Sequence, residues 1–400
     1  MAAGVMERRV RELVDRCHDG LDAPALAAEV MRRLPGVVPV EAAFFATVDP
    51  ATLLFTSAVA QEPLAEATPL FLDNEFGRAD VNKFAALARR PDPVMSLDRA
   101  TRGHRSASPR YQEIMAGLGL GDELRAALVA GHECWGVLCL HLADAEAGFS
   151  ERDLAVVRRI APQVAAGLRA AFGLRAAFGQ DAGTAPASGS PALLVLDSDL
   201  SVVSISPQAD EWLAQIAGPR WHGLPMPVCA VAARVAGTAG GSFEVLGRPD
   251  VSNISEVSDV SRDLARSDGS DRSNGPAHSP VHGSAVRLRT LEGRWLTVRA
   301  VRLRGPAGDH DGVAAQIGVV LEPATAEDLG SLLLSAHGLT PAQTRVVALV
   351  LQGCSTREIV DRLHISANTV QEHLTAVFTR FGVRSRRELV SAVLSAGRRQ

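Results

Sequence analysis

The chain has 400 residues, a formal net charge of −4, 46% hydrophobic residues and 22% charged residues. These values are those of an ordinary soluble protein and allow two or three domains with buried cores. The N-terminal segment "MAAGVMERRVRELVDRC" lacks the apolar stretch of a signal peptide. No apolar run is long enough to cross a bilayer. We therefore expect a cytoplasmic protein without membrane contact.

Five cysteines are scattered along the chain, and an odd, irregularly spaced set argues against a disulfide framework. The densest group of metal-ligating residue types is "HEC" at 132–134 followed by "CLH" at 139–141. In a single strand, Cys134 and Cys139 would point to opposite faces because they are five residues apart. We therefore expect buried structural side chains rather than a zinc site, and neither a metal nor a cofactor.

Residues 1–178 mix helical and strand patterns. Residues 7–34 have the apolar spacing of one amphipathic helix, and 42–50 and 53–60 are predicted strands. A hairpin is expected over 124–144, with Gly131 near its turn and Gly136 at a bulge. A long helix is predicted from Ser150, with Pro162 inside it. Its heptad-spaced apolar residues indicate either a dimer seam or packing on the domain's own sheet: Leu154, Val157, Ala161, Val164, Leu168 and Ala171.

A second segment, residues 191–323, follows a flexible linker at 179–190. It begins with strand, turn, strand and a helix from about Gln208, and later strands within 285–305 and 316–323 complete a small antiparallel sheet. Between them, residues 248–284 are rich in Ser, Asp and Gly and cannot bury enough apolar surface, so we expect a disordered insertion. Residues 324–338 are predicted to form a linker helix.

The C-terminal segment, residues 339–400, is basic. It holds nine arginines against four acidic residues, a net charge of +5, so the rest of the chain carries −9. A basic segment on an acidic chain indicates a nucleic-acid partner. Helix start and stop signals also follow one another closely there: caps at Thr340, Ser355, Ser366 and Ser385, and terminating glycines at Gly353 and Gly382.

The second and third of these four predicted helices are separated by only His364 and Ile365. Two capped helices with so short a connection must turn sharply, as in a helix-turn-helix. On the third helix an apolar stripe is expected to be buried: Val370, Leu374, Val377, Phe378 and Phe381. The opposite face carries small polar side chains that can reach base edges in a major groove. A solvated face is the alternative for a lone helix, but the helix pair and the charge favour DNA.

Residues 339–390 resemble the LuxR-type four-helix DNA-binding domain. The resemblance rests on Leu339-Thr340-Pro341, Gly353, Ile359, Leu363, Ile365-Ser366, Thr369-Val370, His373-Leu374, Phe381-Gly382-Val383 and Arg386. With the exposed face of the third helix, it implies base reading by Asn368, Gln371, Glu372 and Thr375. It implies phosphate contacts by Ser366, Thr369, His373, Arg380, Arg384, Ser385 and Arg386. In this family the fourth helix often dimerises, which implies that role for Leu389, Val390, Val393 and Leu394. Gln371 stands where the family commonly has lysine.

The N-terminal segments resemble sensor domains. Residues 1–178 are similar to a GAF domain, most clearly at "CWGVLCLHL" and "GFSERDLAVVRRIAPQVAAGL", and residues 191–323 to a PAS-like domain. The triplet "NKF" at 82–84 resembles the start of a cyclic-nucleotide-binding GAF signature. The acidic pair expected after it is missing, because Leu87, Ala88 and Arg89 stand there. We therefore expect core or surface roles for the triplet.

These patterns predict a multidomain, one-component transcription regulator. Its α+β GAF-like and PAS-like sensor domains are followed by an all-α helix-turn-helix domain that binds double-stranded DNA as a homodimer. A small-molecule effector and a contact with RNA polymerase are left open. The alternative is a signalling scaffold whose helix-turn-helix contacts proteins instead of DNA.

Three rival classes fit less well. A phosphorelay receiver needs an active-site lysine, but the single lysine, Lys83, lies in a helical pattern. An acyl-homoserine-lactone pocket is normally rich in Trp and Tyr, whereas Tyr111 is the chain's one tyrosine. An enzyme is not supported, because the sequence shows no phosphate-binding glycine loop, H-E-x-x-H motif or G-x-S-x-G nucleophile elbow.

Overall fold

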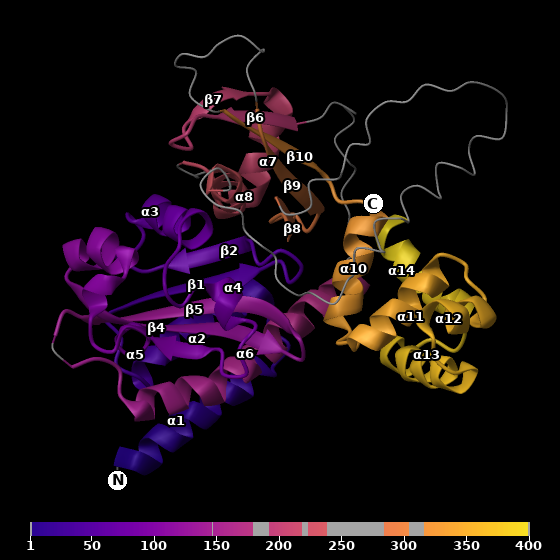
Figure 1. Cartoon of the computed structure of the whole chain (residues 1–400), viewed down its shortest axis with the longest axis horizontal. Coiled ribbons are helices and arrows are strands. Elements are labelled where there is room, and N and C mark those ends of the chain that lie inside the picture. The colour runs from indigo at the N-terminus through magenta and orange to yellow at the C-terminus, as the bar shows by residue number, and fades with distance from the viewer. Residues whose placement is uncertain are drawn as a thin grey trace. The chain divides into compact units, whose positions relative to one another are not determined.

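The computed structural model describes residues 2–145, 147–178, 192–217, 223–237, 284–303 and 316–398 (Figure 1). The chain divides into two compact units. Among the described residues, the second unit is Leu339–Leu394 and the first unit contains the rest. The predicted linker at 179–190, and the predicted insertion at 248–284 except Ser284, lie outside the described residues.

The first domain begins with two helices, α1 (Ala2–Cys17) and α2 (Ala23–Arg33), where one was predicted. The Asp22 carboxylate accepts a hydrogen bond from the Ala25 backbone N–H at 2.8 Å and caps α2. Gly20 just before it has a φ of +71°. The single-helix prediction was wrong because this left-handed residue and this N-cap interrupt a run whose apolar spacing continues across them.

An antiparallel sheet with strand order β2-β1-β5-β4-β3 forms the centre of the first domain. The strands are β1 (Ala42–Val48), β2 (Phe55–Ala60), β3 (Val94–Ser96), β4 (Leu120–Ala130) and β5 (Glu133–Ala143). The predicted strand pair and the predicted hairpin are therefore confirmed. Figure 1 shows α1, α2 and the long α6 (Glu151–Phe178) on one side of this sheet.

Short helical turns between β2 and β4 cover the other face of the sheet, where Leu72, Phe76, Phe84 and Leu87 belong to one apolar cluster with Phe44. These turns are α3 (Thr68–Leu72), η2 (Asp73–Gly77), α4 (Phe84–Leu87), α5 (Leu97–Thr101), η3 (Arg105–Ala107), η4 (Tyr111–Met115) and η5 (Ala116–Leu118). Of these turns the sequence indicated only α4, through the helical pattern around Lys83. The others were not predicted, because each is too short for a helical period to show in the sequence.

Helix α6 packs on the sheet of its own domain. All six heptad-spaced residues of the sequence prediction are buried, and Leu154, Val157 and Leu168 belong to the same apolar cluster as Trp135 of β5. The helix continues through Pro162. Of the two readings left open by the sequence, packing on the domain's own sheet is the one that the described residues confirm.

A bulge in β5 changes which face each side chain occupies. Leu128 pairs with Gly136 and Val129 with Cys134, so Trp135 is an extra residue. Cys134 and Cys139 consequently share one apolar cluster, while Trp135 lies in the other. The predicted bulge at Gly136 is confirmed, but the expectation that the two cysteines face opposite ways was wrong, because one extra residue reverses the alternation. A Cβ at Gly136 would lie 2.9 Å from the Ala46 carbonyl oxygen.

The second domain has its own five-stranded antiparallel sheet, in the order β7-β6-β10-β9-β8. Counted within each domain, both sheets therefore follow the order 2-1-5-4-3. The strands are β6 (Ala192–Leu196), β7 (Val202–Ile205), β8 (Ala285–Arg289), β9 (Trp295–Arg302) and β10 (Ile317–Pro323). The predicted strands and the helix α7 (Pro207–Ala217) are confirmed. The PAS-like assignment stays a prediction.

Helix α8 (Met226–Gly237) was not predicted, and it joins the two sensor domains. Its buried residues include Val228 and Val231, which belong to one apolar cluster with Phe44 of β1 and Leu194 of β6. The two domains thus share a continuous core across α8.

The chain then forms α10 (Ala326–Ala336), so a helix is present where the linker helix was predicted. The second compact unit holds α11 (Pro341–Leu351), α12 (Thr356–Leu363), α13 (Ala367–Phe381) and most of α14 (Arg386–Arg398), up to Leu394. The four predicted helices, and the fold class of an α+β region followed by a helical domain, are confirmed. Within the described ranges, no helix is long and apolar enough to cross a membrane.

Candidate nucleic-acid interface

Two helix caps produce the abrupt turn between α12 and α13. At the start of α12, Ser355 and Glu358 form a capping box, in which the Glu358 carboxylate accepts from the Ser355 N–H at 2.6 Å. His364 ends α12 in the left-handed conformation, with a φ of +52°. Ser366 Oγ then accepts from the Thr369 N–H at 3.0 Å and starts α13. The caps predicted from the sequence are therefore present, and they set the helix-turn-helix geometry.

One face of α13 is buried. Val370, Leu374 and Val377 are at most 4% exposed, and Phe378 and Phe381 are half-buried. Helices α11 and α12 both pack against α13, and their buried residues include Val346 and Ile359. This packing fixes the rotation of α13 about its axis and leaves the opposite face open to solvent.

All four predicted base-reading residues lie exposed on α13. Asn368 Nδ2 donates to Glu372 Oε1 at 2.8 Å, so these two side chains form a pair one helical turn apart. Thr375 Oγ1 donates to the Gln371 carbonyl oxygen at 2.9 Å. The structure thus brings the four residues together on one surface of the domain, while their contact with bases stays a prediction.

The predicted phosphate-binding residues fall into two groups. Ser366 and Ser385 each cap a helix, and Ser385 Oγ accepts from the Glu388 N–H at 3.2 Å. Thr369 Oγ1 lies 2.9 Å from Ser366 Oγ, beside the first of these caps. Of the others, Arg380 and Arg384 are exposed, and His373 is half-buried.

Arg386 has a structural contact that the sequence did not indicate. Its Nη2 donates a hydrogen bond to the Cys354 carbonyl oxygen, which ties the start of α14 to the turn between α11 and α12. At the same turn, Arg362 Nη1 lies 3.0 Å from Cys354 Sγ. The guanidinium of Arg386 is therefore partly committed to the fold, and a phosphate contact by it stays a prediction.

The predicted dimerisation residues on α14 differ in exposure. Leu389 and Val393 are 0% and 1% exposed within the single chain, and Val390 is half-buried. The Leu394 side chain lies outside the described residues. Burial within the chain is thus sufficient to account for two of these apolar positions, and dimerisation through α14 stays a prediction.

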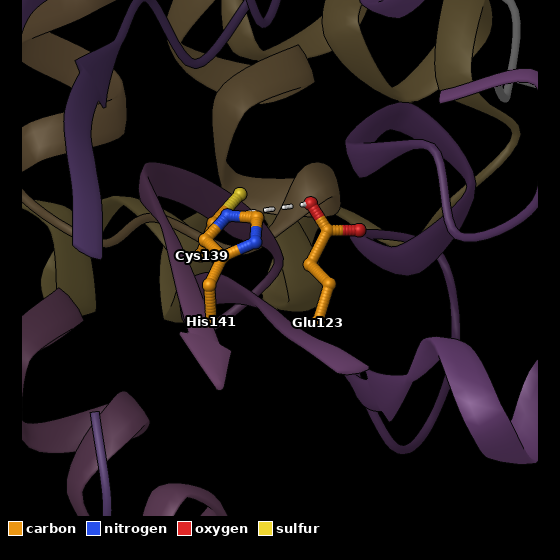
Figure 2. A group of neighbouring side chains, drawn as sticks. All are labelled: Glu123, Cys139 and His141. Carbon is orange, nitrogen blue, oxygen red and sulfur yellow. Dashed lines mark ion pairs between the residues drawn. The ribbon is translucent and has the colours of Figure 1, made fainter. Parts of the chain in front are cut away.

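A second candidate site lies inside the first domain. Figure 2 shows Glu123 of β4 beside Cys139 and His141 of β5, with ligating atoms within 4.8 Å of one another, all buried. His141 Nε2 lies 3.8 Å from Glu123 Oε1. Among the candidate metal-ligating residues of the sequence, this group contains Cys139 and His141 but neither His132 nor Cys134. Glu123 was missed, because its proximity depends on the pairing of β4 with β5.

Two buried arginines donate hydrogen bonds to the Glu123 carboxylate. Its Oε2 accepts from Arg110 Nε and Nη2 at 2.9 and 2.7 Å, and its Oε1 accepts from Arg125 Nε at 3.0 Å. Arg125 Nη1 also donates to Glu75 Oε2 at 2.7 Å. Burial raises the pKa of Glu123, but the two guanidinium groups outweigh it and hold that pKa well below its ordinary value. A cation would meet two positive charges here, so we interpret the group as an ion-pair network.

The "NKF" triplet has structural roles beside this network. Burial lowers the pKa of Lys83 to about 8, and its Nζ donates to the carbonyl oxygens of Asn74 and Arg78. Phe84 is 3% exposed, and Asn82 has a φ of +56°. Phe84 thus lies in the core, and Lys83 hydrogen-bonds backbone carbonyls, so both have structural roles.

Acid should destabilise the first domain through His141. Burial lowers the pKa of His141 to about 4 in the folded chain, whereas an unfolded chain has the ordinary value of 6.5. Below pH 6.5 the unfolded state therefore binds a proton that the folded state does not, and stability falls as the pH falls toward 4. Between pH 6.5 and pH 5 the wild type should lose about 1–2 kcal/mol of stability through His141. His141→Phe should not show this loss. Hydrogen exchange of β4 and β5 amides at both pH values measures this.

The matched control is His132→Phe, which changes an exposed histidine in the turn of the same hairpin. The control should keep the wild-type pH dependence. Equal pH dependence in the wild type and in His141→Phe would contradict the burial argument.

Comparison with known proteins relates the two ends of the chain to families. Residues 337–393 match the family model described as "Bacterial regulatory proteins, luxR family", and residues 7–168 match that of the GAF domain. Two curated relatives, provisionally named as HTH-type transcriptional regulators of Mycobacterium bovis and Mycobacterium tuberculosis, are each 44% identical over 59 residues. That segment covers 15% of this chain and only 7% of either relative.

Solved structures with some likeness include a phycoerythrobilin-bound GAF domain from a cyanobacterial phytochrome, at 14% identity and a TM-score of 0.28. The VqsR LBD domain from Pseudomonas aeruginosa has 19% identity and a TM-score of 0.29. These two cover 42% and 40% of this chain, and 95% of each matched chain. The Vibrio cholera VqmA–ligand–DNA complex has 18% identity and a TM-score of 0.19, over 52% of this chain and 84% of that chain. Such low TM-scores support no detailed comparison.

Proposed function

We propose that this chain, with its GAF domain and its LuxR-type helix-turn-helix domain, is a one-component transcriptional regulator that binds operator DNA. The observation that carries the proposal is the exposed polar face of α13, held in a fixed orientation by a buried apolar stripe and two capped turns. The net charge of +5 on the surrounding segment supports a polyanionic partner. The match of residues 337–393 to the luxR-family model supports the proposal, and the curated relatives, named as HTH-type regulators, are consistent with it.

In this function, α13 lies in the major groove and presents Gln371, Glu372 and Thr375 to base edges. Arg380 and Arg384, near the end of α13 and in the following turn, contact phosphates and supply affinity without sequence choice. Two copies bind two half-sites about 34–36 Å apart, one turn of the DNA helix. The sensor domains change how the DNA-binding domain is presented, in response to an effector, and a contact with RNA polymerase sets the transcriptional outcome. No catalytic step is part of the proposal.

The test is selection of genomic DNA fragments by the purified full chain, followed by gel-shift titration of the selected fragments. We expect the wild type to enrich a two-fold symmetric sequence. The matched control is the double variant Gln371→Ala/Glu372→Ala, which changes only exposed side chains of α13 and should bind DNA with strongly relaxed sequence selection. If the wild type enriches nothing over the double variant at physiological salt, the proposal is wrong, and a scaffold role that engages proteins replaces it.

A further inference from the structure

Helix α10 is the last element before the DNA-binding domain. Only four residues, 337–340, separate it from α11, and Gly338 among them has a φ of +65°. The first compact unit includes the segment Ser284–Gly338, so α10 belongs with the sensor domains. Whatever fixes α10 therefore determines where the DNA-binding domain is attached.

Both sensor domains hold α10. At its first turn, Asp328 caps the helix with Thr325, and Oδ1 of Asp328 accepts from Arg299 Nη2 of β9 at 3.0 Å. Further along, Leu332 is buried in the apolar cluster of the first domain. At its last turn, Ser335 Oγ donates to Glu133 Oε1 of β5 at 2.5 Å. The helix thus bridges the second domain at its start and the first domain at its end.

Arg287 of β8 lies where these three parts meet. Its Nε and its backbone N–H donate to Asp49 Oδ2 at 2.8 and 3.0 Å, and its Nη2 donates to Asp49 Oδ1 at 2.6 Å. Its Nη1 donates to the Asp328 carbonyl oxygen at 2.7 Å and to Ser331 Oγ, both in α10. Asp49 directly follows β1 of the first domain and also accepts from the Ala51 N–H at 2.9 Å. One guanidinium therefore connects the first domain, the second domain and α10.

Burial makes this junction sensitive to the loss of either partner. The side chains of Arg287 and Asp49 are 9% and 1% exposed. Burial lowers the pKa of Arg287, but the hydrogen bonds and the charge of Asp49 outweigh it, and the net effect raises that pKa. Removing one partner of such a pair leaves the other charge buried without compensation, which is far more costly than losing a surface pair.

We propose that Arg287 is a positioning residue that fixes α10 to both sensor domains, so that a rearrangement at the end of β1 reaches the helix that carries the DNA-binding domain. The step from α10 to DNA rests on the proposed function. The step from Asp49 to α10 does not.

The first experiment measures hydrogen exchange of α10 amides in the full chain without DNA. We expect Arg287→Met and Asp49→Asn each to accelerate exchange in residues 326–336 by roughly tenfold or more, because the restraint on the helix is lost. The double variant should exchange no faster than the faster single variant, because both changes break one junction. The matched control is Arg299→Met, on the same sheet, which contacts α10 through Asp328 but does not reach Asp49. Because the Arg299 side chain is 46% exposed, its loss should change exchange by less than about threefold.

The second experiment measures DNA affinity of the same full-length variants at fixed salt. We expect Arg287→Met and Asp49→Asn to shift affinity in the same direction and by a similar factor, with Arg299→Met near the wild type. Unchanged α10 exchange in both junction variants overturns the proposal, and so does faster exchange with wild-type DNA affinity. A wild type that binds no DNA overturns the proposed function instead, while the exchange result still decides whether Arg287 positions α10.

Discussion

Glu123→Gln is expected to destabilise the first domain by about 3–5 kcal/mol, the usual consequence of removing one partner from a buried ion pair. The Glu123 carboxylate is 0% exposed and accepts three hydrogen bonds from Arg110 and Arg125, which are themselves 1% and 0% exposed. A glutamine keeps the shape of the side chain but leaves two guanidinium groups short of one negative charge. The high cost of a buried, uncompensated charge is the reason for the large effect.

Hydrogen exchange of amides in β4 and β5 of the full chain measures this loss locally, which matters because a chain of several domains does not unfold in two states. The matched control is Glu113→Gln. Glu113 pairs with Arg78 at 2.6 Å, but both side chains are about two-fifths exposed. The control should lose at most about 1 kcal/mol. Equal losses in the two variants would show that the buried network does not hold the domain together.

The DNA-binding domain could be predicted almost completely from the sequence because its signals are local. Ser355 and Glu358 are three residues apart, and Ser366 stands directly before the helix that it caps. Each cap satisfies backbone groups within the same turn, so no knowledge of distant contacts is needed. The contact of Arg386 with Cys354 was missed because it spans 32 residues.

Helix α8, by contrast, could not be predicted from the sequence. Its buried residues lie on every side of the helix: Pro227, Val228, Ala230, Val231, Ala232, Ala233 and Val235. A helix covered by two sheets has no polar face, so its sequence shows no amphipathic period. For the same reason, the sequence did not indicate that α8 belongs to a core shared by both sensor domains.

The buried network of the first domain was also out of reach of the sequence. Arg125 contacts Glu75 across 50 residues, and Glu123 meets Arg110 across 13. The charged residues of β4 indicate a solvated strand face when they are read alone. They are buried because the short helical turns between β2 and β4 cover that face, and no periodicity predicts how such turns fold back.

A substitution on the exposed face of α13 gives the other large expected effect, a change in base preference. Gln371→Ala is expected to relax base preference at one or two operator positions, by about 1–3 kcal/mol of discrimination for each lost bidentate contact. Gln371 is exposed on α13, and the hydrogen bond from Thr375 engages its backbone carbonyl rather than its side chain. Selection of operator variants by the full chain measures the preference. Gln352→Ala, which changes an exposed glutamine at the end of α11, is the matched control and should leave the selected operator unchanged.

Arg384→Ala should lower DNA affinity without changing the base preference. Its exposed side chain lies between α13 and α14, where phosphates would run. Its backbone N–H donates to the Glu388 carboxylate at 2.8 Å, and within the described part of the chain its side chain makes no hydrogen bond or ion pair. Arg384 is a cleaner choice than Arg386, whose removal would also break the contact with Cys354. We expect Arg384→Ala to weaken binding to all sequences alike and to reduce the slope of log affinity against log salt by about 0.9, the effect of one phosphate. An altered operator in Arg384→Ala, together with an unaltered one in Gln371→Ala, would mean that α13 does not lie in the groove with this face toward the bases.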